Sequence, residues 1–320
     1  MNRCCGETVG AIEHAFLQKY GAIDNATELA KLTAVLEKYR RLAGSIRIFS
    51  ELRVADIPAP AAAMIMRAKC PVCADEQAII VVSSAILLAI EQLVSLYGSV
   101  VLAWDQEPKF RELTDADFAA FEQIIADFVE RGAASFSHIA PTMERAPRHV
   151  RAAFEKMIDV AKAWVVAHEL AHFYHSSFMF SADPNFMETK HRIETLLERA
   201  AVDQGDLTKE NWAVELFADA VATDTLAIDL QNHHDDIPAL ERLLGGVGAA
   251  LEVIYRLEIA VIGLRCMQPD FVPKHPPAAL RWDAICGGRE AKLAAVLGTI
   301  SQKFATQAQS TQGLAPLDRI

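Results

Sequence analysis

The chain has 320 residues, of which 52% are hydrophobic and 23% are charged, and its formal net charge is −11. This length is sufficient for one large domain or two ordinary ones with a sizeable core. Nucleic-acid binding requires a basic surface, so the acidic balance argues against that class of partner. We expect an ordinary globular protein without a nucleic-acid ligand.

Six cysteines, at positions 4, 5, 70, 73, 266 and 286, predict free thiols rather than a disulfide framework. The opening segment MNRCCGETVG lacks the apolar stretch of a secretory signal, so we expect a reducing, cytoplasmic location. Cys70 and Cys73 form one CxxC, with no second such pair to complete a tetrahedral zinc site. A plain pair of loop cysteines is the simpler interpretation, and a zinc knuckle is the alternative.

The first 75 residues predict helix followed by a strand. Residues 11–43 have helical spacing that is interrupted at Gly21 and ends near Gly44. Alternating apolar residues over 46–54 predict a strand, which the following prolines end. We treat residues 1–75 as an N-terminal region of unknown role.

A strongly apolar segment follows at residues 78–104. Its first part, 78–82, is mostly β-branched and predicts a strand, after which a serine caps a helix. Glu91 and Gln92 interrupt the segment and leave too few consecutive apolar residues for a membrane-spanning helix. Residues 245–264 carry charges that would be costly in lipid. We expect no stable membrane insertion.

The rest of the chain is predominantly helical in its spacing. Apolar residues with a 3.6-residue period predict helices over 115–131, from about 149 to 180, and at about 187–203, 209–230 and 238–267. Residues 135–148 contain two prolines and predict a loop. The expected fold class is mainly α with a small β-sheet (α+β), with one domain over 76–304 and a flexible tail over 305–320.

Residues 163–178, AWVVAHELAHFYHSSF, place two histidines and a glutamate within an apolar helix. His168 and His172 are four positions apart, so both rings lie on one helix face, where they can bind a single zinc ion. Glu169 lies about 100° round the helix, where it can act as general base on a zinc-bound water. This HExxH pattern also arises by chance, and two core histidines beside a surface glutamate are the simpler alternative.

A hydrolytic zinc site needs a third protein ligand. The metzincin pattern requires glycine and histidine at the positions where this chain has His175 and Phe178. Residues 211–222, NWAVELFADAVA, instead offer Glu215 as the ligand and Asp219, one turn later, as the acceptor of a hydrogen bond from a ligand histidine. An exposed acidic pair is the alternative, which the apolar neighbours disfavour because burying unpaired carboxylates is costly.

HELAH, ELFAD and HPPAALR (residues 275–281) occur in the order typical of gluzincin metallopeptidases, which residues 78–285 resemble. HPPAALR is similar to the HPxxxxR element of the HtpX-like enzymes, although this chain lacks their membrane helices, and the Lit-like phage-exclusion peptidases are also similar. The resemblance implies a zincin-like core with an active-site helix and a glutamate-ligand helix. It also implies that His275 stabilises the oxyanion, with a rigid turn as the alternative, and that Arg281 has a structural or charge-pairing role.

These residues predict one Zn²⁺ per chain and a zinc-dependent endopeptidase that acts on a restricted protein or peptide substrate. A catalytically silent sensor or protein-binding module with the same fold is the alternative. Retention of Glu169 favours the enzyme, because a binding module has no need of a general base. A structural zinc protein is disfavoured because the site offers three ligands rather than four.

Overall fold

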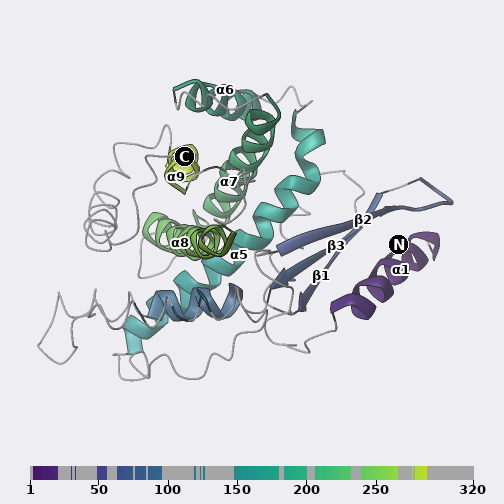
Figure 1. Cartoon of the computed structure of the whole chain (residues 1–320), viewed down its shortest axis with the longest axis horizontal. Coiled ribbons are helices and arrows are strands. Elements are labelled where there is room, and N and C mark those ends of the chain that lie inside the picture. Colours follow the sequence, from purple (N-terminus) through teal and green to yellow (C-terminus); the bar gives the residue numbers. More distant parts are fainter. Residues whose placement is uncertain are drawn as a thin grey trace, which may run out of the picture.

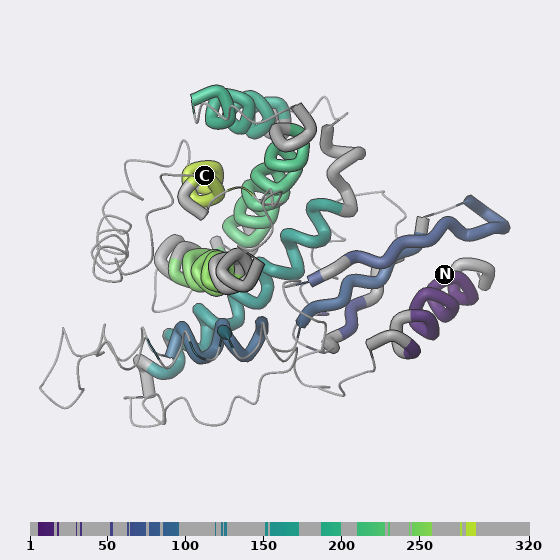
Figure 2. The backbone as a smooth tube through the Cα atoms, in the orientation of Figure 1, coloured from purple at the N-terminus to yellow at the C-terminus, as the bar shows by residue number. Residues whose placement is uncertain are grey.

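The computed structural model describes ten segments, residues 3–20, 49–55, 63–74, 76–83, 86–95, 148–179, 184–199, 206–231, 239–265 and 278–286, and isolated positions at 30, 33, 119, 123, 125, 126 and 276. These residues are mainly helical and include one small three-stranded sheet, as the α+β prediction requires. In Figure 1 one helix lies on one side of the sheet and the longer helices gather on the other. Figure 2 shows the same arrangement as a backbone tube.

The sheet has the strand order β1-β3-β2. Its strands are β1 (Phe49–Ala55), β2 (Ala63–Lys69) and β3 (Glu76–Ser83); β3 pairs with β1 in parallel and with β2 antiparallel. Both β1 and β3 fall at predicted strands. Sequence reasoning missed β2, because its residues AMIMRAK are mostly not of the β-branched or aromatic types that strands prefer. The domain boundary expected after residue 75 lies in the β2–β3 turn, with paired strands on both sides.

The two faces of β3 pack against different parts of the protein. Ile79 and Val81 pack on α1 (Arg3–Tyr20), whereas Ile80 and its neighbours on that face join the main core. The main core also receives the buried side of helical residues 86–95. The sheet therefore separates α1 from the helices that carry the predicted site.

The described residues of the C-terminal half form helices that largely match the predicted ones. They are α5 (Arg148–Met179), α6 (Pro184–Arg199), α7 (Asp206–Gln231), α8 (Ala239–Arg265) and α9 (Ala278–Cys286). Both ends of α5 lie within one residue of the prediction, because its apolar period is unbroken over its whole length. The nine-residue α9 was not predicted. Within the described helices, none combines the length and apolar character needed to cross a bilayer.

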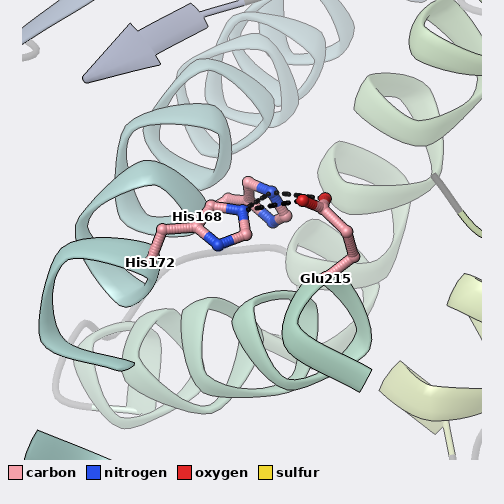
Figure 3. Close-up of side chains that lie close together, drawn as sticks. All are labelled: His168, His172 and Glu215. Atoms are coloured by element: carbon pink, nitrogen blue, oxygen red, sulfur yellow. Dashed lines mark hydrogen bonds and ion pairs between the residues drawn. The ribbon is translucent and has the colours of Figure 1, made fainter. Parts of the chain in front are cut away.

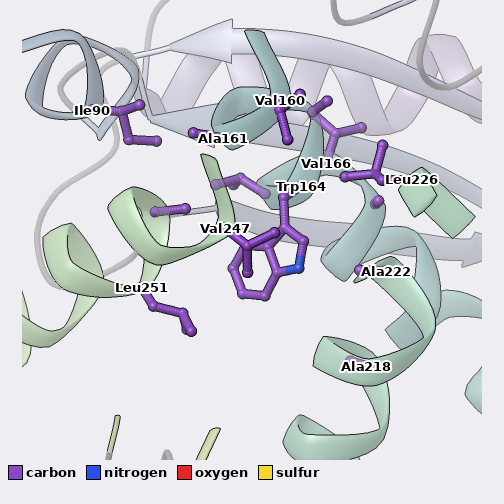
Figure 4. Close-up of a cluster of buried hydrophobic side chains, with 14 of the residues drawn as sticks. Ile90, Val160, Ala161, Trp164, Val166, Ala218, Ala222, Leu226, Val247 and Leu251 are labelled. Carbon is purple, nitrogen blue, oxygen red and sulfur yellow. The ribbon is translucent and has the colours of Figure 1, made fainter. Parts of the chain in front are cut away.

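Trp164 fixes the packing of α5 against its neighbours (Figure 4). Its ring is fully buried, and its Nε1–H donates to the Thr223 hydroxyl of α7 at 3.0 Å. In Figure 4 the indole lies among side chains of α5, α7 and α8, including Ala222 and Val247. A satisfied indole N–H lets this large ring be buried at little polar cost. This packing sets the position of the next turn of α5, which begins with His168.

Several predicted segments lie partly or wholly outside the described residues. The predicted helix at 115–131 is described at only four positions, all helical. The predicted loop at 135–148, most of the helical spacing between residues 21 and 43, and the tail from 305 are outside the description, so these predictions stay predictions.

Candidate metal centre

The side chains of the two motif histidines project from successive turns of α5, and their Nε2 atoms lie close together. His168 is buried, with 8% of its surface exposed, and His172 is half-buried. Their Nε2 atoms are 2.9 Å apart, and the rings lie edge to face. The rings therefore share one face of α5, as their four-residue spacing requires.

Helix α7 brings a carboxylate to the same point (Figure 3). Glu215 Oε2 lies 3.4 Å from His168 Nε2, and Glu215 Oε1 lies 3.3 Å from His172 Nε2. A tetrahedral ion bound at about 2 Å holds neighbouring ligand atoms about 3.3 Å apart, so both carboxylate distances fit a shared ion. Among the described residues, these three form the one group of histidine, cysteine or acidic side chains that could hold a metal ion.

Asp219 and Arg281 lie behind His168 and hold it in place. His168 Nδ1 is 2.8 Å from Asp219 Oδ1, and Asp219 is fully buried. Arg281 of α9, only 3% exposed, donates from Nε and Nη2 to the two Asp219 oxygens, both at 2.8 Å. The carboxylate keeps the Nδ1 proton on its own side, which leaves the Nε2 lone pair for a metal. The sequence suggested both residues but did not pair them with each other.

Neighbouring charges shift the pKa values of His168, Glu215 and Asp219. Burial alone would lower the pKa of His168, but Asp219 and Glu215 outweigh burial and raise this pKa to about 10. Burial would raise the pKa of Glu215, but the two histidines hold it well below its usual range. For Asp219 the charge of Arg281, followed by that of His168, outweighs burial and lowers the pKa. A positive charge is therefore favoured at this point, as a metal-binding centre requires.

Glu169 lies beside these ligands on an open cleft of about 420 Å³. The cleft is lined by Ala63, Ile65, Arg67, His168, Glu169, His172, Val214 and Glu215. One wall is β2, whose Arg67 donates from Nη2 to the His172 carbonyl oxygen at 3.2 Å. Sequence reasoning missed this wall because it missed the strand. Glu169 thus faces the same open space as the three candidate ligands.

Two other histidines of the sequence analysis lie wholly or partly outside the described residues. His275, the predicted oxyanion-stabilising residue, lies outside the described residues, although its neighbour Pro276 is described and buried. His175 belongs to α5, but its side chain lies outside the description.

Comparisons with known proteins returned no relative. No protein-family model matches the chain, and neither a curated protein nor a solved structure does so. The case for a metal centre therefore rests on His168, His172 and Glu215 and on the residues around them.

Proposed function

We propose that this protein is a zinc-dependent endopeptidase of the gluzincin type. The observation that carries the proposal is the meeting of His168, His172 and Glu215 at distances that fit one tetrahedral ion, beside Glu169 on an open cleft. Three ligands of the nitrogen and oxygen type leave a fourth position for water, which is typical of catalytic rather than structural zinc. When bound, zinc would lower the pKa of a water and polarise a substrate carbonyl.

Glu169 supplies the acid–base chemistry. It is adjacent to His168 in sequence, and it lines the cleft without belonging to the three-residue ligand group. A carboxylate in this position takes the proton from the attacking water and delivers it to the leaving amine. His168 stays fixed throughout, because Asp219 and Arg281 hold its ring from behind.

The wall formed by β2 favours an extended peptide as the substrate. β2 is an outer strand of the described sheet, and Ala63, Ile65 and Arg67 on one of its faces line the cleft. An outer strand presents main-chain N–H and C=O groups that can pair with an extended chain. A peptide bound along β2 would therefore pass beside Glu169 and the ligand group.

A Glu169→Gln variant tests this function. The amide cannot accept a proton, so cleavage should fall by roughly 10²–10⁴-fold while zinc content stays unchanged. Mass spectrometry of new peptide termini in a cell extract treated with zinc-loaded parent or variant measures the loss. Glu155→Gln is the matched control, because Glu155 is an exposed residue of the same helix.

Equal cleavage by the parent and Glu169→Gln would show that Glu169 is not the general base. A zinc-loaded parent that cuts no protein would instead favour the catalytically silent sensor or binding module.

A further inference from the structure

One face of β2 changes from apolar to basic along the strand. Side chains alternate between the two faces of a strand, and Met66 and Ala68 pack on the α1 side of the sheet. The opposite face, which contributes the wall of the cleft, carries in order Ala63, Ile65, Arg67 and Lys69. The first two are partly buried against the main core, whereas the two basic side chains are exposed. In Figure 1 β2 extends from α5 towards the β2–β3 turn, so the basic part of this row lies nearer the turn.

Arg67 gives the cleft a positive charge. Among the described residues that line the cleft, it is the one whose side chain is permanently cationic. Its Nη2 donates to the His172 carbonyl oxygen at 3.2 Å, which keeps the guanidinium beside a turn of α5 that carries a candidate metal ligand. The carboxylates of Glu169 and Glu215 balance the charge of a bound Zn²⁺, so Arg67 leaves the metal-loaded cleft with a net positive charge. This local charge is opposite to that of the whole chain, whose formal net charge is −11.

An extended peptide that pairs with β2 would bring every second side chain to the cleft face. Residues directly opposite each other on neighbouring strands present their side chains on the same face, and such positions repeat about every 6.6–6.8 Å along a strand. The peptide residues opposite Arg67 and Lys69 are therefore two positions apart, and the residue opposite Ile65 is two positions beyond. Opposite charges stabilise cross-strand pairs. This spacing fits acidic residues at two alternate positions and an apolar residue at the next alternate position.

The same two charges disfavour other strands. Charged side chains on an outer strand prevent a protein from pairing with copies of itself, because a second copy would bring further basic side chains to this edge. An acidic strand brings the opposite charge, and a guanidinium can bind a carboxylate through two parallel N–H···O bonds. The row on β2 therefore discriminates between extended segments by their charge.

We propose that Arg67 and Lys69 select an acidic substrate, an extended protein segment with carboxylates at two alternate positions facing these side chains and an apolar side chain facing Ile65. The inference rests on the proposed peptidase function, since it names the segment that the cleft would receive. Arg67 contributes most of the selection, because its planar fork matches a carboxylate and lies on the cleft itself. Lys69 adds a point charge farther along the strand.

Peptide binding to full-length Glu169→Gln with equimolar zinc tests this selection without requiring cleavage. The probe is a fluorescein-labelled peptide with two glutamates separated by one residue and a leucine two positions outside each, a symmetric arrangement that fits either strand direction. Fluorescence anisotropy should show binding roughly 2–30-fold tighter than that of the glutamine counterpart, as expected for two exposed charge pairs. A peptide of the same composition with adjacent glutamates should bind more weakly than the probe, because neighbouring side chains point to opposite faces.

Variants of the basic row separate selection from a structural role of Arg67. Arg67→Ala should weaken binding of the glutamate peptide and leave binding of the glutamine peptide unchanged, and Arg67→Lys should restore part of the difference because it keeps the charge without the fork. Arg67→Glu/Lys69→Glu should reverse the preference in favour of a lysine counterpart of the probe. Arg199→Ala is the matched control and should keep the preference, because Arg199 is an exposed residue of α6 outside the cleft lining.

Equal affinity for the glutamate and glutamine peptides, or no binding of either, would overturn the acidic substrate. An equal loss for both peptides in Arg67→Ala would overturn the selecting role of Arg67 and leave it as a support for the His172 backbone. Failure of the peptidase function has a different signature, in which the glutamate preference persists but the zinc-loaded parent cuts no protein. That result would support the selection of acidic segments and contradict the peptidase.

Discussion

Replacing Asp219 by asparagine should destabilise the protein and weaken its metal centre at the same time. Asp219 is fully buried and touches two cationic partners, Arg281 at 2.8 Å and His168 at 2.8 Å. Asparagine keeps the shape but removes the charge, so the guanidinium of Arg281, buried at 3% exposure, loses the carboxylate charge of Asp219.

The magnitude follows from the burial of both partners. Removing one member of a buried ion pair costs about 3–5 kcal/mol, because the remaining buried charge loses its attraction to the removed one. Loss of the carboxylate behind a ligand histidine lowers metal affinity by roughly 10–100-fold. The double variant Asp219→Asn/Arg281→Met removes both charges, so it should recover most of the lost stability but none of the lost metal affinity.

Urea unfolding in the presence of a chelator measures the stability of the metal-free state, and competition with a chromogenic chelator measures metal affinity. The single and double variants form a cycle with the parent and with Arg281→Met. A loss below about 1 kcal/mol for Asp219→Asn would refute the buried ion pair, since surface pairs contribute about that much or less. Equal metal affinity in the parent and Asp219→Asn would refute its role behind His168.

Two further predictions concern pH and helix packing. The raised pKa of His168, about 10, means that its proton stabilises the metal-free fold below the ordinary value of 6.5 and that this contribution is lost as pH rises through 10. A metal ion must displace that proton, so metal affinity should rise about tenfold per pH unit between about pH 7 and pH 9. Chelator competition measures this affinity, and a flat profile would contradict the raised pKa of His168. Gly246→Ala should destabilise by about 1–3 kcal/mol in urea, because its methyl would lie 2.7 Å from Val160 Cγ1 and 2.9 Å from the Met157 carbonyl oxygen. Gly248→Ala, whose methyl meets only ordinary contacts, is the control, and equal stability of the two variants would contradict the close packing of α8 on α5.

The histidine pair could be predicted from sequence because its geometry is local. The spacing of His168 and His172 decides their common face once the segment is helical, and the unbroken apolar period of α5 makes the helix evident. Glu215 followed from the need for a third ligand and from its apolar neighbours. No long-range contact was needed for any of these three inferences.

The parts that escaped prediction depend on contacts between distant segments. β2 takes its structure from pairing with β3, and its own residues are mostly poor strand formers. The Asp219–Arg281 pair joins positions 62 residues apart, and its bidentate geometry appears only after α7 and α9 have packed. The packing of α1 on β3 is likewise a tertiary property that the sequence did not indicate.

The most direct test of the central claim is the zinc content of the histidine centre. Elemental analysis of the parent, His168→Ala and Glu215→Ala should show a loss of about one zinc per chain in each variant, because two remaining ligands bind weakly. His191→Ala, on the exposed side of α6, is the matched control and should retain the zinc of the parent. Circular dichroism confirms that each variant remains folded. Zinc content equal to that of the parent in both folded ligand variants would contradict a metal centre at His168, His172 and Glu215.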